Sequence, residues 1–163
     1  MNQKRISHLL IAAGALAAAG ILALALLYAP ALASACLEAF KETPNIQGLY
    51  RFGLAGVWTE SLIFLLALAE YMLISVRIGR NRSFCPENVR GLRRIALYLS
   101  VDGVLWLLAI IAPSFIFHIL IGPVWVLFLL VSMGTFALAL LAWCLGGLLS
   151  RAVEIQREND LTV

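Results

Sequence analysis

Long apolar runs separated by short polar segments dominate the chain. A helix needs about 20 apolar residues, at about 1.5 Å per residue, to cross the roughly 30 Å hydrocarbon core of a bilayer. Four runs are long enough, and we predict spans over residues 9–36, 53–76, 95–121 and 124–149. The pattern therefore predicts an all-α fold. We expect residues 1–163 to form a single transmembrane domain, an integral membrane four-helix bundle.

The apolar stretch between Pro113 and Pro123 must contain the turn that joins the last two spans. Proline and glycine both favour turns. Two positions are therefore candidates, Pro113–Ser114 and Gly122–Pro123, and the sequence does not choose between them.

The composition indicates that these helices lie in a membrane. Hydrophobic residues make up 63% of the chain and charged residues 13%, whereas soluble domains are about 45–50% apolar and about 25% charged. So few charges cannot cover a water-facing surface. This argues against a soluble enzyme, a disordered protein and a nucleic-acid-binding domain, and we expect no direct contact with nucleic acid.

The basic residues are distributed unequally between the two sides of the predicted membrane. Ten of the 12 Lys and Arg residues lie before the first span, in the 77–94 loop or in the 150–163 tail, whereas Lys41 and Arg51 lie on the other side. Cytoplasmic segments carry an excess of Lys and Arg. We therefore predict that both termini, the loop and the tail are cytoplasmic.

The first span has an alternative interpretation as a signal peptide. It starts after Lys4 and Arg5 and ends with Ala33-Ser34-Ala35 before Cys36, which resembles a cleavage site. The apolar run is longer than the roughly 7–15 residues typical of a signal peptide. We therefore favour a retained span.

Small residues recur at four-residue spacing, which lets helix backbones approach closely in lipid. The stripes are Gly134, Ala142, Gly146 and Ser150 in the fourth span, and Gly14 and Ala18 in the first. We expect them to pack helices within the chain. Contact between copies in a homo-oligomer is the alternative.

Three carboxylates, Glu60, Glu70 and Asp102, fall within the predicted spans. Burying them in a membrane is costly unless they are protonated, paired or hydrated. Counted from the flanking arginines, Glu70 and Asp102 lie at similar depth in antiparallel spans, where they could share a proton. Tyr98 lies one turn before Asp102 and is a candidate hydrogen-bond donor. An arginine from the loop is the alternative partner.

Glu60 lies ten residues from Glu70, about 15 Å closer to the outer side. Arg51 and His118 are its candidate partners. Two hypotheses follow for the intramembrane acids. They line a path or a site for a proton or cation, or they are polar groups that fix helix packing, which we favour.

The loop before the third span predicts a short amphipathic helix. Pro86 suits the first helical position and Glu87 the positive end of the helix dipole, with Asn88 following. The basic residues of this helix are Arg90, Arg93 and Arg94. We expect them to contact anionic lipid head groups, at about 1 kcal/mol per basic residue. A dedicated protein partner is the alternative.

The tail continues the fourth span and ends in polar residues. Its candidate interaction residues are Glu158, Asn159 and Asp160. An acidic tail beside a basic loop could dock on that loop or face a soluble partner. The cysteines and histidines are scattered without a CxxC pair or metal-ligand spacing. We therefore expect no metal, no cofactor and no catalytic group.

Two segments resemble a known protein family. Residues 84–95 read FCPENVRGLRRI and residues 154–163 read EIQRENDLTV. Both resemble the signatures of domain of unknown function 2975, a family of small bacterial four-span membrane proteins, although Cys85 and Gly91 depart from the usual residues. The resemblance implies a location in the bacterial cytoplasmic membrane and implies no catalytic residue, since the family has no established activity.

The resemblance also implies genomic company, because such proteins are often encoded beside a small helix-turn-helix regulator. It thus suggests a non-enzymatic regulatory, signalling or immunity-type partner of that regulator. The alternative function is a small proton-coupled transporter or channel that uses the intramembrane carboxylates.

Overall fold

The structure is a computed structural model that describes residues 3–39, 46–117 and 122–161. Within these residues the chain is helical except for the short loop before α4. The elements are α1 (Gln3–Ala23), the π-helical segment η1 (Leu24–Tyr28), α2 (Ala29–Ala39), α3 (Ile46–Gly79), α4 (Pro86–Phe117) and α5 (Gly122–Leu161). The predicted all-α class is confirmed. The π-helical segment comes just before Pro30, which has no N–H to donate to the helical hydrogen-bond ladder.

Four helices are long and apolar enough to cross a membrane. Their apolar segments are Lys4–Ala31, Tyr50–Gly79, Pro86–Ile116 and Val126–Asn159. At about 1.5 Å per residue each exceeds the roughly 30 Å needed. The chain is therefore a multi-pass membrane protein.

The residues between α4 and α5, 118–121, lie outside the described part of the chain. Helix α4 continues through Pro113 to Phe117, so the candidate turn at Pro113–Ser114 is wrong. A proline inside a helix removes one backbone hydrogen bond without necessarily ending the helix. The Ser114 hydroxyl donates to the carbonyl oxygen of Ile110 at 2.9 Å within the same stretch.

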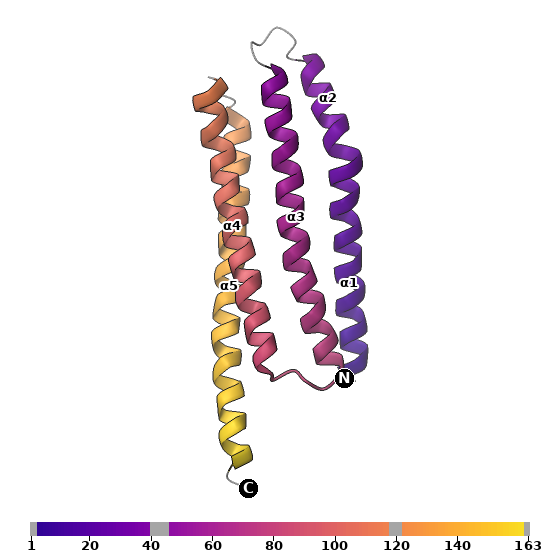
Figure 1. Cartoon of the computed structure of the whole chain (residues 1–163), viewed down its shortest axis with the longest axis vertical. Coiled ribbons are helices and arrows are strands. Elements are labelled where there is room, and N and C mark those ends of the chain that lie inside the picture. The colour runs from indigo at the N-terminus through magenta and orange to yellow at the C-terminus, as the bar shows by residue number, and fades with distance from the viewer. Residues whose placement is uncertain (1–2, 40–45, 118–121, 162–163) are drawn as a thin grey trace.

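The helices pack in the order in which they occur in the sequence. Helix α1 contacts α3, α3 contacts α4, and α4 contacts α5 (Figure 1). Within the described residues α5 contacts neither α1 nor α3, so the bundle is open and not closed into a ring. Helices α3 and α4 each have neighbours on two sides, and large apolar side chains are exposed on every helix long enough to span the membrane.

Small side chains form the seam between α4 and α5. The buried residues of α5 are Ser132, Thr135, Ala139, Ala142 and Gly146. They alternate spacings of three and four, as in supercoiled helix packing. The predicted stripe at constant spacing four is partly wrong, because such a row drifts around the helix. A Cβ at Gly134 would meet open space.

The contact between α1 and α3 is closest at Gly79. A Cβ added there would lie 2.7 Å from the Cβ of Ser7 and still closer to its hydroxyl. The buried Ser7 hydroxyl donates to the carbonyl oxygen of Ser75 at 2.7 Å. About two turns further along α1, Gly14 lies against the side chains of Tyr71 and Met72. Helix proximity therefore requires glycine at position 79, whereas a Cβ at Gly14 would need only a small shift of the neighbouring side chains.

Candidate functional site

The start of α1, the end of α5 and the loop between α3 and α4 lie at the same end of the molecule (Figure 1). We call this the arginine-rich end; it comprises residues 77–94 and the last turns of α5. Helix α5 projects beyond the other helices at this end, because its 40 residues span about 60 Å. The prediction placed the loop, the tail and the start of the first span on one side of the membrane, and their position at one end of the molecule agrees with it. The side of the membrane that this end faces stays a prediction.

The loop at the arginine-rich end starts with a helix cap on α3. Asn81 adopts a left-handed conformation with φ of 60°. The N–H of Asn81 donates to the carbonyl oxygen of Ile78 at 3.1 Å, and that of Arg82 to the carbonyl oxygen of Arg77 at 3.0 Å. This is the Schellman pattern, in which asparagine tolerates the position that glycine usually occupies.

Asn88 holds the rest of this loop in place. Its side-chain amide donates to the carbonyl oxygens of Arg82 at 3.1 Å and Ser83 at 2.9 Å, and its side-chain oxygen accepts from Arg77 at 3.5 Å. The residue is 1% exposed. Asn88 was predicted to be an interaction residue at the surface. The structure instead buries it, because its side chain must lie inside the loop to reach the backbone of Arg82 and Ser83.

The other candidates of the basic segment lie on the surface. Glu87 pairs with Arg90 at 3.2 Å across one helical turn. Such exposed pairs contribute little to stability. Arg93 is exposed, and its stem lies 3.8 Å from the position of a Cβ on Gly146 of α5. These side chains form a cationic surface at the start of α4.

Glu70 of α3 is paired with Arg94 of α4. A nitrogen of the Arg94 guanidinium lies 2.8 Å from a Glu70 carboxylate oxygen. The predicted pairing of Glu70 with Asp102 is therefore wrong, and an arginine takes that place. The predicted depth of Asp102 was counted from Arg94, on the assumption that Arg94 lies at the membrane boundary. However, α4 begins at Pro86, so Arg94 already lies two turns inside the helix.

The acidic neighbour of Asp102 is instead Glu60. The two carboxylates interact electrostatically, and Trp106 lies close enough to offer its indole N–H to either. Asp102 is 1% exposed and neither of its carboxylate oxygens has a hydrogen-bond partner. The predicted hydrogen bond from Tyr98 is thus absent, and Tyr98 lies near Arg94. The proposed Glu60 partner His118 lies outside the described residues.

Sequence reasoning missed Trp106, which interacts with both members of this carboxylate pair. Trp106 lies four residues after Asp102, on the same helical face, and packs edge-to-face on Phe128 of α5 with ring centroids 4.8 Å apart. The i, i+4 spacing was a signal that could have identified Trp106. No group of three or more metal-ligating side chains occurs in the parts of the chain that the structure describes.

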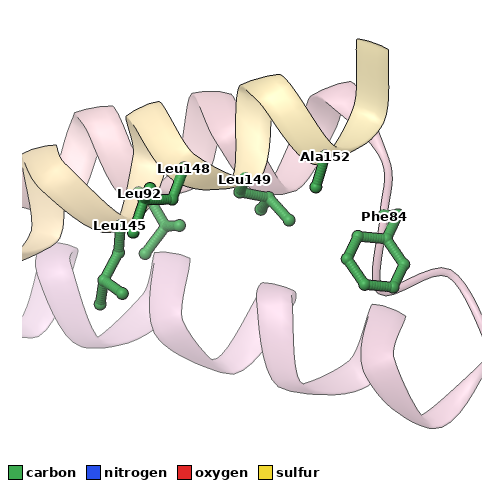
Figure 2. A pocket seen from close by; sticks show the side chains of 6 residues that line it. All are labelled: Phe84, Leu92, Leu145, Leu148, Leu149 and Ala152. Carbon is green, nitrogen blue, oxygen red and sulfur yellow. The ribbon is translucent and has the colours of Figure 1, made fainter. Parts of the chain in front are cut away.

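An apolar groove of about 380 Å³ opens at the arginine-rich end (Figure 2). Its lining residues are Phe84, Leu92, Leu145, Leu148, Leu149 and Ala152. They come from the loop, α4 and α5, and Figure 2 shows them gathered between the ribbons. Phe84 is 59% exposed although it lies in a polar loop.

Comparison with known families decides what the chain belongs to. The family described as "Protein of unknown function (DUF2975)" matches residues 34–163. The chain belongs to this family. Comparisons of this DUF2975 protein with curated proteins and with solved structures found no match. The matched region contains the carboxylate pair and the arginine-rich loop, and all of α1 precedes it.

Proposed function

We propose that this DUF2975 protein is a non-enzymatic membrane partner of a cytoplasmic helix-turn-helix regulator. The observation that carries the proposal is the projection of α5, whose 40 residues cover about twice the roughly 30 Å of a bilayer core. A helix of that length presents its last turns well outside the membrane. Glu158 and Asn159 lie exposed in those turns, and Asp160 belongs to the last turn of α5.

A second feature supports a protein partner at the same end. The apolar groove with exposed Phe84 lies beside the cationic start of α4, where Arg90 and Arg93 are exposed. An apolar groove next to basic side chains suits an amphipathic helix with acidic flanks. The resemblance to a family often encoded beside small helix-turn-helix regulators supplies the identity of the proposed partner. The proposal places this end in the cytoplasm.

Co-purification tests the proposal directly. The full chain is tagged, solubilised in mild detergent and mixed with the purified regulator encoded beside its gene. We expect a stable complex, and we expect Phe84→Ala and a chain ending at Arg157 each to reduce recovery of the regulator at least about fivefold, a loss of roughly 1 kcal/mol of binding.

Leu141→Ala is the matched control for Phe84→Ala, because both side chains are 59% exposed and Leu141 lies in the membrane-spanning part of α5. This control is expected to leave recovery unchanged. An equal loss in both variants would point to general destabilisation. Failure of the unmodified chain to retain the regulator would overturn the proposal.

A second candidate function is proton-coupled transport or conduction. The observation that favours it is the carboxylate pair of Glu60 and Asp102 inside the membrane-spanning region, since acids in such positions often belong to ion pathways. Proton flux into liposomes containing the purified protein tests it. We expect a pH-gradient-driven flux that Asp102→Asn abolishes and Glu70→Gln retains. Absence of flux with the unmodified chain would eliminate this candidate.

A further inference from the structure

The ion pair between Glu70 and Arg94 shows the depth of Glu60 and Asp102 relative to one another. It joins α3 and α4 at one level. Glu60 lies ten residues before Glu70, and Asp102 lies eight residues after Arg94. In antiparallel helices these offsets place the two acids about 15 Å and about 12 Å beyond the ion pair. The carboxylates therefore lie at nearly the same depth, in agreement with their electrostatic contact.

The surroundings of Asp102 offer little to stabilise a negative charge. Both carboxylate oxygens are buried without a hydrogen-bond partner. The buried hydroxyls of α5 along this seam donate to backbone groups. Ser132 donates to the carbonyl oxygen of Gly103 at 2.8 Å, and Thr135 to that of Ser132 at 2.9 Å. Among the described residues, the polar side chain that interacts with the Asp102 carboxylate is Trp106.

No basic side chain among the described residues compensates this pair of acids. The electrostatic neighbours of Glu60 and Asp102 are each other and Trp106. Arg94 is already bonded to Glu70. Arg51 lies nine residues before Glu60 on α3, about 13 Å along the helix. The membrane-spanning parts of α1 and α5 between residues 9–36 and 122–150 contain no charged residue.

Two adjacent carboxylates without a cation cannot both remain ionised in an apolar environment. A metal ion would remove the repulsion, but hard cations require about six oxygen ligands. Here two carboxyl groups are available, the neighbouring hydroxyls are occupied, and the indole N–H of Trp106 repels a cation. A proton needs no such ligand shell. It converts one carboxylate into a donor that satisfies the other.

We propose that Glu60 and Asp102 bind one proton between them, as a carboxylic acid hydrogen-bonded to a carboxylate. The O–H bond forms on one carboxyl oxygen, and the second carboxylate accepts the hydrogen bond. Trp106 donates to the shared negative charge. This proposal deepens the second candidate function, because it names the ligand of the same site. The bound proton does not itself require flux, so protonation and transport are separate measurements.

The proposal is tested with dicyclohexylcarbodiimide, an apolar reagent that modifies protonated carboxyl groups. The purified full chain in detergent micelles is treated between pH 6 and pH 9, and adducts are located by peptide mass spectrometry. We expect one adduct per chain, on Glu60 or Asp102, at neutral pH. Glu70 is the internal control, because its carboxylate is bonded to the Arg94 guanidinium and we expect no adduct on it. A parallel infrared spectrum measures the C=O stretching band of a protonated carboxyl and does not depend on reagent access.

Isosteric variants separate a shared proton from an isolated acid. In Asp102→Asn the repulsion that retains the proton is gone, so labelling of Glu60 should be lost at a pH lower by about one unit or more. Glu60→Gln should shift the infrared band in the same direction, and Glu70→Gln should leave both measurements unchanged. The proposal is overturned if the unmodified chain shows no carboxyl C=O band at neutral pH that Glu60→Gln and Asp102→Asn alter. Equal labelling of Glu70 would also overturn it.

Discussion

Removing the side chain of Asn88 should open the loop at the arginine-rich end without unfolding the membrane-spanning helices. In Asn88→Ala the carbonyl oxygens of Arg82 and Ser83 lose their hydrogen-bond donors. The neighbouring hydrogen bonds of the Asn81 cap and the helices do not depend on the side chain of Asn88. The effect should therefore be local.

The magnitude follows from the number of hydrogen bonds lost. The amide of Asn88 makes two well-formed bonds at 2.9 and 3.1 Å and accepts one long bond from Arg77 at 3.5 Å. Each buried carbonyl left without a donor costs about 1–3 kcal/mol, and the loop is only partly buried, so we take the lower value for each. A total near 2 kcal/mol raises the population of the open loop about 30-fold.

Cys85 provides the assay because it lies in the same loop and is 6% exposed. A buried thiol reacts with a water-soluble maleimide only when the loop opens. The measurement uses the purified protein with Cys36→Ala and Cys144→Ala as background, so that one thiol remains. We expect the alkylation rate of Cys85 to rise about 30-fold in Asn88→Ala, in proportion to the open population.

The control is Arg90→Gln, which removes an exposed partner of Glu87 and should change the rate no more than about twofold. A rise of less than about threefold in Asn88→Ala would refute the assignment of Asn88 as the residue that holds the loop. A similar rise in both variants would refute the claim that the effect is specific to these hydrogen bonds.

Two further predictions concern helix contacts and are measured by thermal unfolding in detergent. Gly79→Ala should lower the melting temperature, because its Cβ would overlap Ser7. Adding Ser7→Gly should recover part of the loss, since it removes the overlap but also the hydrogen bond to Ser75, and a double variant no more stable than the sum of the two single variants would show that the contact is not the cause. Gly103→Ala should also destabilise, because its Cβ would lie 2.9 Å from the hydroxyl of Thr135. The matched Gly134→Ala, whose Cβ meets nothing within 4 Å, should stabilise by up to about 1 kcal/mol. Equal effects at the two positions would contradict the assigned seam.

Apolar run length was sufficient to predict the helices, because the bilayer sets how many apolar residues a span needs. It could not predict how far α5 continues, since nothing in run length limits a helix once its residues leave the membrane. The proline rule for soluble proteins led to the wrong candidate turn at Pro113–Ser114. Proline disfavours a helix interior in water, whereas in a span neighbouring groups re-satisfy the freed backbone.

The carboxylates show which part of the site was predictable. The free-energy cost of placing a carboxylate in a membrane was enough to identify Glu60, Glu70 and Asp102 as residues that need partners. The pairing depended on the relative register of α3 and α4, which the contact between Glu70 and Arg94 shows and which apolar run length does not contain. A shift of eight residues exchanged the partners, and positions counted from loop arginines cannot detect such a shift. Asn88 illustrates the converse, because a polar residue in a basic loop suggests a surface position until its hydrogen bonds are known.

The order of helix contacts has a consequence for biosynthesis. Each described helix packs against the one made just before it, so every partner is already in the bilayer when the next helix arrives. No contact must wait for a distant segment, and the topology contains little of the long-range pairing that slows folding. The chain can thus assemble in steps during translation, and truncation after any completed helix should leave the earlier pairs intact.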